Sequence, residues 1–257
     1  MSSIHTSDSS SARDGCGKRG FGAVLFDLYD TLIWLDVEKS NARRRQMAER
    51  MGVSLERFMA VWRRSVDDRM LGRGGSLADH LAAATASLGL VPDPSLLSDL
   101  VEIERNRLRE SVHLYPDVVP FLQRLRKAGY RLGLLSNVSD GAAIPIAHLG
   151  IDRLFDELIL SHEVGLLKPD PAIYLLACRR LACLPQETVF VADGGFGELD
   201  AAQRLGIYSV MLEQDHQSKE YGSSTSYDLK IRHLRELEPL LGLPSHLDPG
   251  GTTCGLL

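Results

Sequence analysis

Short apolar stretches alternate with longer amphipathic stretches along most of the chain. Five of the short stretches are predominantly apolar and lack the alternation of a strand with one wet face: residues 23–26, 132–135, 158–160, 189–192 and 209–212. Continuous apolar runs of this length are typical of strands that are buried on both faces of a parallel sheet. The pattern therefore predicts five buried strands.

Amphipathic segments separate these strands. Residues 118–128 repeat apolar side chains at helical spacing and are followed by Gly129, a common helix stop. Residues 172–181 and residues 199–205 show the same pattern. Repetition of strand, helix and strand predicts an α/β fold with a Rossmann-like, doubly wound parallel sheet.

Residues 37–113 interrupt this rhythm. They contain no convincing buried strand, and the spacing of their apolar residues predicts four helices, over residues 41–51, 55–70, 77–88 and 95–111. An insertion directly after the first strand lies above the carboxyl end of the sheet, where open α/β sheets bind ligands. We therefore expect a helical cap or lid over residues 37–113.

The two ends of the chain have a different composition from the rest. Residues 1–20 are rich in Ser, Gly and Asp, without the apolar block of a secretory signal, which predicts a disordered lead-in. The end of the chain, residues 244–257, is rich in Gly, Pro and small residues and is expected to be a flexible tail. The Rossmann-like core is then expected to comprise residues 21–36 and 114–243.

Composition and charge exclude several classes of protein. The 257 residues are 44% hydrophobic and 25% charged, which is typical of globular proteins. A net charge of −5 argues against a nucleic-acid-binding surface, and no apolar run is long enough for a membrane helix. Four scattered cysteines without a CxxC pair indicate neither a disulfide scaffold nor structural zinc. We expect a soluble cytoplasmic protein, either monomer or homodimer.

Reactive side chains follow four of the predicted strands. Asp27 begins the segment DLYDTL after the first strand, and Ser136 and Asn137 end the second. Lys168 follows the third strand, and an acidic pair at positions 193 and 198 follows the fourth. Each motif alone is weak, because acidic residues, Ser and Asn favour turns in any protein. Together they predict one reactive group of side chains at one edge of the sheet.

In order and strand context, these motifs resemble those of the haloacid dehalogenase-like hydrolases. The resemblance covers about residues 21–212. The family carries an Asp nucleophile in a DxDxT segment, followed by Ser or Thr, Lys and an acidic pair. It implies a Rossmann-like core with a helical cap after the first strand. It also implies that Asp27 is the nucleophile, that Ser136 and Asn137 hold the transferring group, and that Lys168 neutralises charge.

The resemblance further implies a magnesium site. Asp193 and Glu198 would complete this site with Asp27 and with the backbone carbonyl of Tyr29. Glu198 departs from the family pattern, which usually has Asp at this position. The longer carboxylate still reaches the ion, directly or through water.

Tyr29 is the larger departure. Most phosphatases of the family have a second Asp here, which protonates the leaving oxygen and later activates water. Tyrosine is the pattern of the 2-haloacid dehalogenases, and the pair Trp62–Arg63 resembles a Trp-Arg pair of those enzymes, whose Arg helps to take the halide. Arg63 is thus a candidate substrate ligand, although we favour a surface helix residue. Asp30 is expected to point away from the site and to be a poor substitute acid.

The acidic fourth motif decides between the two reactions. Displacement of halide from carbon needs no metal, and in the dehalogenases the fourth motif is mostly neutral. Three converging carboxylates repel one another strongly without a cation. We therefore predict a Mg²⁺-dependent phosphatase that acts on a small phosphorylated metabolite through an aspartyl-phosphate intermediate. The alternatives are a metal-independent 2-haloacid dehalogenase and a catalytically impaired binding protein of the same fold.

Overall fold

A parallel sheet of six strands forms the centre of the protein. In the computed structural model, residues 20–214 and 224–244 are described. The strand order is β5-β4-β1-β6-β7-β8, and every neighbouring pair is parallel. The strands are β1 (Ala23–Phe26), β4 (Arg131–Ser136), β5 (Glu157–Leu160), β6 (Thr188–Ala192), β7 (Tyr208–Leu212) and β8 (Leu229–Ile231). The predicted doubly wound α/β fold is confirmed; the predictions for residues 1–19 and 245–257 lie outside the described residues.

Burial on both faces explains why β1 is apolar without alternation. All four of its residues are fully buried. Val24 and Phe26 point into one apolar cluster, whereas Ala23 and Leu25 point into a second cluster on the opposite face of the sheet. A central strand of this kind needs apolar side chains at every position.

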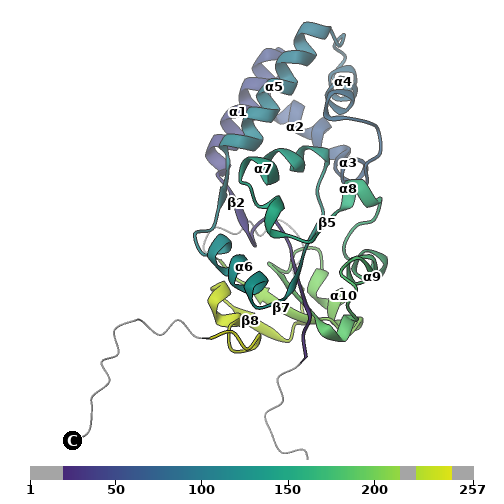
Figure 1. The fold of residues 1–257 in the computed structure, drawn as a ribbon. Helices are drawn as coiled ribbons and strands as arrows, with labels where there is room; N and C mark the ends of the chain where they lie inside the picture. Colours follow the sequence, from purple (N-terminus) through teal and green to yellow (C-terminus); the bar gives the residue numbers. More distant parts are fainter. Residues whose placement is uncertain (1–19, 215–223, 245–257) are drawn as a thin grey trace, which may run out of the picture.

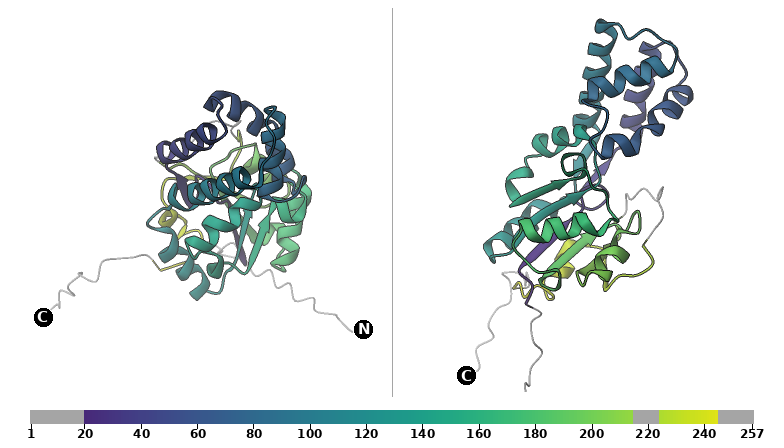
Figure 2. Two further views of the ribbon diagram at one scale, coloured as in Figure 1. Left: turned by 90° about the horizontal axis from the view of Figure 1, so that it is seen from above. Right: turned by 90° about the vertical axis from the view of Figure 1, so that its right-hand side faces the viewer.

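Helices cover both faces of the sheet (Figures 1 and 2). Residues of α6 (Val118–Lys127) and α7 (Ala143–His148) belong to the cluster on the first face. Residues of α9 (Pro171–Arg180) and α10 (Glu198–Arg204) belong to the cluster on the second face. Shorter helical turns connect the elements: α8 (Ser161–Val164), η1 (Asp140–Ala142), η2 (Asp152–Leu154), η3 (Pro185–Glu187) and η4 (Leu234–Leu237).

Five helices lie together beyond one end of the sheet (Figure 1). They are α1 (Val37–Arg50), α2 (Leu55–Arg64), α3 (Val66–Met70), α4 (Leu77–Ser87) and α5 (Pro94–Glu110). We call residues 37–110 the helical insertion. It has an apolar cluster of its own, which includes Met47, Phe58, Leu81 and Leu100. This separate cluster means that the helical insertion packs largely on itself.

A two-stranded antiparallel ribbon joins the helical insertion to the sheet. It consists of β2 (Ile33–Leu35) and β3 (Val112–Leu114). Neither strand of the ribbon was predicted from the sequence, and β8 was not predicted either. The prediction that residues 37–113 contain no strand is wrong at residues 112 and 113, which belong to β3. Each of these strands has only three residues, which is too short to show a period of two. The predicted helix over residues 55–70 is also interrupted, at Ser65.

Two contacts of the helical insertion fix its position on the core. The backbone N–H of Leu77, at the start of α4, donates to Oδ2 of Asp140 at 2.7 Å. Gly72 lies so close to α8 that a Cβ atom on it would be 2.1 Å from the carbonyl oxygen of His162. Its φ of 69° also favours glycine.

No described helix is long and apolar enough to cross a membrane.

Candidate active site

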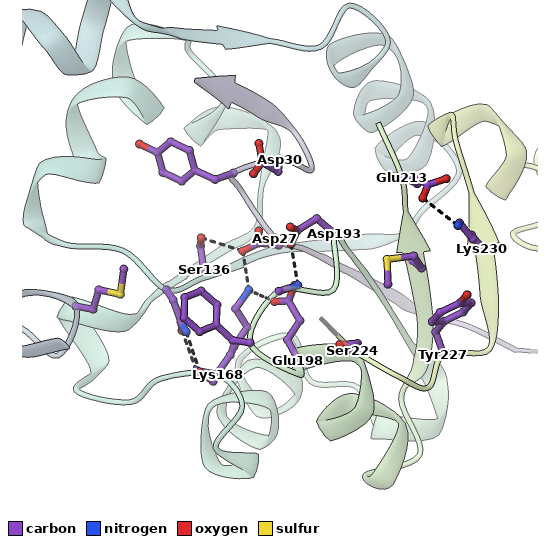
Figure 3. A pocket seen from close by; sticks show the side chains of 16 residues that line it. Asp27, Asp30, Ser136, Lys168, Asp193, Glu198, Glu213, Ser224, Tyr227 and Lys230 are labelled. Atoms are coloured by element: carbon purple, nitrogen blue, oxygen red, sulfur yellow. Dashed lines mark hydrogen bonds and ion pairs between the residues drawn. The ribbon is translucent and has the colours of Figure 1, made fainter. Parts of the chain in front are cut away.

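A cavity of about 390 Å³ lies at the carboxyl edge of the sheet (Figure 3). Seven of the eight site residues predicted from the sequence line it: Asp27, Tyr29, Ser136, Asn137, Lys168, Asp193 and Glu198. They come from segments that are far apart in the sequence, and the parallel sheet brings their strand ends together. Arg63 is the exception, because it is exposed on α2 and does not line the cavity.

Asp27 lies at the centre of this group. It directly follows β1, and its backbone N–H donates to the carbonyl of Val191 in β6 at 3.0 Å. The hydroxyl of Ser136, at the end of β4, donates to Oδ1 of Asp27 at 3.0 Å. Nζ of Lys168 donates to the same oxygen at 2.6 Å. The carboxylate of Asp27 is therefore held in one orientation by groups from two other segments.

Lys168 bridges two carboxylates inside the protein. Its side chain is 97% buried, and Nζ lies 2.6 Å from Oδ1 of Asp27 and 2.5 Å from Oε2 of Glu198. Burial alone would lower the pKa of the Lys168 amine, but the negative charges of Asp27 and Glu198 outweigh it and raise the pKa above its ordinary value. Lys168 therefore remains an ammonium ion at neutral pH.

Asn137 positions the segment that carries Lys168. Its Nδ2 donates to the carbonyl of Lys168 at 2.8 Å, and its Oδ1 accepts from the N–H of Lys168 at 2.8 Å. The pair of bonds ties the end of β4 to the loop after α8. The predicted contact between Asn137 and a transferring group stays a prediction.

The loop between Asp193 and Glu198 turns the chain so that both side chains meet. Three of its four residues have positive φ: Gly194 (86°), Phe196 (56°) and Gly197 (68°). A Cβ atom on Gly194 would lie 2.4 Å from Cε of Met211, so the close packing here also requires glycine. The N–H of Gly194 donates to Oε1 of Glu198 at 3.2 Å. The first residue of α10 is thereby directed back toward the end of β6.

Asp27, Asp193 and Glu198 form an acidic cluster. Each offers a carboxylate oxygen, and these oxygens lie within 4.8 Å of one another. Burial, together with the charge of Asp27, raises the pKa of Asp193. Burial raises the pKa of Glu198 as well; Lys168 opposes this shift, while Asp27 and Asp193 add to it. Three carboxylates against one ammonium ion leave an excess of negative charge, and carboxylate oxygens are the donors that Mg²⁺ prefers.

Tyr29 lines the cavity beside Asp27. Burial raises the pKa of its hydroxyl, and the charges that act on it most strongly are those of Arg107, Glu104 and Arg44 in the helical insertion. Asp30 also lines the cavity, contrary to the expectation from strand alternation. Its backbone is left-handed, with φ of 56°, so the alternation of an extended chain ends at this residue.

The partner of Trp62 is Arg69 instead of Arg63. The guanidinium of Arg69 lies 3.9 Å from the centre of the Trp62 ring and donates to the Trp62 carbonyl at 2.7 Å. Burial lowers the pKa of Arg69 to about 10. Arg69 precedes Met70, which lines the cavity. Trp62 therefore pairs with Arg69 and not with the adjacent Arg63, because the chain turns between α2 and α3.

Several lining residues were missed by sequence analysis. Phe196 lies in the loop between Asp193 and Glu198, and the others come from β7, β8 and the residues beside them: Met211, Glu213, Ser224, Tyr227 and Lys230. Aside from the family motifs, the sequence carries no signal that places Glu213, Ser224, Tyr227 and Lys230 in the same cavity as Asp27. Only the strand order, in which β7 lies beside β6 and β8 lies beside β7, brings these residues to the same cavity.

Comparison with known proteins places this geometry in a family. The family model of the haloacid dehalogenase-like hydrolases matches residues 21–206. A glyceraldehyde 3-phosphate phosphatase of Methanopyrus kandleri is 30% identical over 198 residues, which cover 75% of this chain and 84% of that protein. The (S)-2-haloacid dehalogenase 4A of Burkholderia cepacia is 30% identical over 227 residues, which cover 85% of this chain and 94% of that protein.

A solved structure gives the same result. The 2-haloacid dehalogenase of Pseudomonas syringae pv. Tomato has a TM-score of 0.65 at 25% identity, and the match covers 86% of this chain and 98% of that one. The phosphatase relatives and the dehalogenase relatives are both hydrolases. With its matching residues 21–206 and with Asp27, Ser136, Lys168 and the acidic pair at one edge of the sheet, the chain belongs to the haloacid dehalogenase-like hydrolases.

Proposed function

We propose that the protein is a Mg²⁺-dependent phosphatase of a small phosphorylated metabolite. The acidic cluster of Asp27, Asp193 and Glu198 carries this proposal. In the described part of the chain, Lys168 is the cation hydrogen-bonded to this cluster, and it contacts only two of its members. A divalent cation offsets the remaining repulsion, and such a cation has a use in phosphoryl transfer because the transferring group is itself anionic.

The reaction begins at Asp27. One carboxylate oxygen of Asp27 attacks the phosphorus atom; an O–P bond forms, the bond from phosphorus to the leaving oxygen breaks, and an aspartyl phosphate results. Ser136 and Lys168 hold the carboxylate in place, as their bonds to its Oδ1 indicate. When bound, Mg²⁺ supplies positive charge at the transferring group. Water then hydrolyses the acyl phosphate, which releases inorganic phosphate and restores Asp27.

The departing oxygen needs a proton unless it leaves as a stable anion. Tyr29 occupies the position of the usual carboxylic acid, and burial raises the pKa of its hydroxyl, which makes it a poor proton donor. General acid catalysis contributes typically about 10²- to 10⁴-fold to a rate. We therefore expect the protein to favour substrates whose leaving group needs little protonation.

The position of the helical insertion supports the proposal that it caps the reaction centre. It lies beyond the carboxyl edge of the sheet, and Met70 of α3 reaches the cavity (Figure 1). A cap that excludes water strengthens the interaction of buried charges with an anionic substrate. The phosphatase relatives, named as acting on glyceraldehyde 3-phosphate, favour a small phosphorylated substrate.

A 2-haloacid dehalogenase is the second candidate, and Tyr29 favours it. The dehalogenase relatives are as similar to this chain as the phosphatase relatives. In that reaction Asp27 would attack carbon and displace halide, which needs neither a metal nor a proton donor. The acidic cluster argues against this candidate, because halide displacement gives no use for the excess negative charge of Asp193 and Glu198.

One assay separates the two candidates. The purified protein is incubated with a panel of phosphomonoesters and with 2-chloropropionate, each with Mg²⁺ and with EDTA, and the release of phosphate and of chloride is measured. We expect phosphate release that requires Mg²⁺. Asp193→Asn is expected to weaken this Mg²⁺-dependent release, and Asp67→Asn, which alters an exposed carboxylate outside the cavity, serves as its matched control. Chloride release that is insensitive to EDTA would contradict the proposal.

A further inference from the structure

We infer that the leaving group of the substrate carries an aromatic ring, and that this ring lies against Tyr227 in the part of the cavity over β7 and β8. The inference rests on the proposed phosphatase function and names its substrate class. The reaction steps proposed above leave one side of the cavity unused. The reaction centre occupies the edge over β1, β4 and β6, whereas the cavity continues to Tyr227 and Lys230 (Figure 3).

One exposed aromatic side chain, Tyr227, lines this part of the cavity, whereas Phe196 belongs to the loop between Asp193 and Glu198. Tyr227 is 37% exposed and Phe196 is 41% exposed. Among the described residues, the other large apolar side chains with comparable exposure are aliphatic and lie outside the cavity. Exposed aromatic rings in a concave site are typical of surfaces that bind an apolar ligand. The Tyr227 ring therefore marks the far end of the cavity as a binding surface.

The segment that carries Tyr227 is fixed on its N-terminal side. The N–H of Ser224 donates to the carbonyl of Gly194 at 2.6 Å, and the hydroxyl of Ser224 accepts from the N–H of Leu199 at 3.0 Å. The N–H and the hydroxyl of Thr225 both donate to the carboxylate of Asp200. These bonds attach the segment to the loop and helix that present Asp193 and Glu198.

The same segment is fixed on its C-terminal side. The carboxylate of Asp228 accepts from the N–H of Ser209 at 2.9 Å and from the Ser209 hydroxyl at 3.0 Å. Directly before Tyr227, the hydroxyl of Ser226 donates to the side-chain oxygen of Gln203. Polar residues on both sides of Tyr227 are thus engaged with α10 and β7, while the Tyr227 ring lines the cavity. An aromatic ring on a fixed backbone loses little conformational freedom when it binds a ligand.

Further contacts connect this surface to the reaction centre. Met211 in β7 packs on Gly194, between the two acidic residues of the fourth motif. Lys230 is the register partner of Met211 in β8, and its Nζ lies 3.0 Å from Oε1 of Glu213. A leaving group that extends from Asp27 would therefore meet an apolar floor, an aromatic wall and a charged rim. A volume of 390 Å³ lies within the range of about 300–1,000 Å³ typical of sites for ring-containing ligands.

Tyr29 supports the same substrate class independently. A site without the usual carboxylic acid favours leaving groups that depart as stable anions. Phenolates are more stable anions than alkoxides, and they carry an aromatic ring. Phenolic phosphates therefore satisfy both the chemistry near Tyr29 and the surface near Tyr227.

The test separates ring recognition from leaving-group reactivity. Benzyl phosphate and cyclohexylmethyl phosphate have leaving groups of similar basicity and size, and only the first is aromatic. We expect kcat/KM for benzyl phosphate to be about three- to tenfold higher, the magnitude typical of one aromatic pair. Tyr227→Leu, which keeps apolar bulk but removes the ring, is expected to bring the ratio close to one. Tyr227→Phe is expected to preserve the ratio.

Controls distinguish the possible failures. Leu175→Ala removes a comparably exposed side chain of α9 outside the cavity, and it is expected to leave the ratio unchanged. Circular dichroism and the Tm establish that each variant is folded; if Tyr227→Leu is not, Tyr227→Met replaces it. A ratio of one in the native protein, or an unchanged ratio in Tyr227→Leu, overturns the inference. If the native protein hydrolyses neither ester with Mg²⁺, the inference is overturned; if it also releases no phosphate from the other phosphomonoesters but releases chloride from 2-chloropropionate, the phosphatase function itself fails.

Discussion

The two sides of the cavity hold their side chains in opposite ways. Over β1, β4 and β6, the charged groups of Asp27, Lys168 and Glu198 are buried and bonded to one another. Over β7 and β8, Tyr227 and Lys230 are exposed, and hydrogen bonds of neighbouring residues fix the segment that carries Tyr227. Both sides are firmly positioned, but only the first side depends on the mutual attraction of its own charges.

This difference separates two kinds of consequence. Removal of one charge on the buried side leaves its partners uncompensated in a poorly solvated place, so stability and activity change together. Removal of a side chain on the exposed side leaves its neighbours solvated, so the fold is little affected and the choice of substrate changes. The predictions below examine this contrast.

The largest effect is expected at the nucleophile. Asp27→Asn should lower kcat by at least about 10³-fold, because the amide cannot form the acyl phosphate. The measurement is steady-state phosphate release with Mg²⁺, together with far-UV circular dichroism to establish folding. Near-normal turnover by folded Asp27→Asn would show that Asp27 is not the nucleophile.

The two lysines of the cavity provide a direct comparison of stability. Lys168→Met should lower the free energy of unfolding by about 3 kcal/mol in metal-free buffer, because the carboxylates of Asp27 and Glu198 lose their buried partner. Lys230→Met, which breaks the exposed pair with Glu213, should cost less than about 1 kcal/mol. Urea unfolding measures both values. Equal losses in the two variants would contradict the contrast between the two sides.

Magnesium should offset part of the loss in Lys168→Met. A bound divalent cation compensates the same carboxylates that the lysine compensates in the native protein. We therefore expect Mg²⁺ to raise the Tm of Lys168→Met more than it raises the Tm of Lys230→Met. A larger response of the second variant would place the cation elsewhere.

Tyr29→Asp should act on one class of substrate. It introduces a carboxylic acid near the leaving oxygen, so hydrolysis of alkyl phosphates should rise by about tenfold or more. Phosphates with good leaving groups, such as p-nitrophenyl phosphate, should respond much less. The slope of log kcat/KM against leaving-group pKa is measured in both proteins, and it should be flatter in the variant. Identical slopes in a folded, Mg²⁺-binding variant would mean that the native protein already has another acid.

The smallest expected effect is a pH dependence of stability. The pKa values of Asp193 and Glu198 are raised above their ordinary values, by burial first. Between the ordinary and the raised values, the folded protein binds more protons than the unfolded chain, so the metal-free protein loses stability as the pH rises. Mg²⁺ binds the deprotonated carboxylates, and its effect on stability should grow over the same interval.

Thermal unfolding tests this dependence. The Tm is measured between about pH 5 and pH 8, with and without Mg²⁺, because ordinary carboxyl pKa values lie near 4. The increase in Tm on addition of Mg²⁺ should be larger at the upper end of this range. A constant increase would show that neither carboxyl group changes its protonation on metal binding.

The side chains of the candidate active site could be brought together from the sequence because several of them end buried strands. The runs before Asp27, Ser136 and Asp193 are continuous and apolar, and the carboxyl ends of parallel strands share one edge of the sheet. Asp30 and Arg69 could not be placed in this way. The orientation of Asp30 depends on one left-handed residue, and the stacking of Arg69 depends on the turn at Ser65.

The surface near Tyr227 illustrates a different limit. Its segment consists mainly of Ser, Thr and Asp, a composition typical of any exposed loop. Its fixed position arises from contacts with Gly194, Asp200 and Ser209, which are 19 to 30 residues earlier in the chain. Such contacts depend on which strands are neighbours, and local patterns of hydrophobicity contain no information about that order.

Gly72 sets the gap between the helical insertion and the sheet. The contact of Gly72 with the carbonyl of His162 leaves no room for even one methyl group. An alanine at this position would have to move α3 and α8 apart by roughly an ångström, since non-bonded carbon and oxygen atoms rarely approach closer than about 3 Å. Met70, two residues earlier, lines the cavity, so its position there depends in part on the missing side chain of a residue that lies outside the cavity.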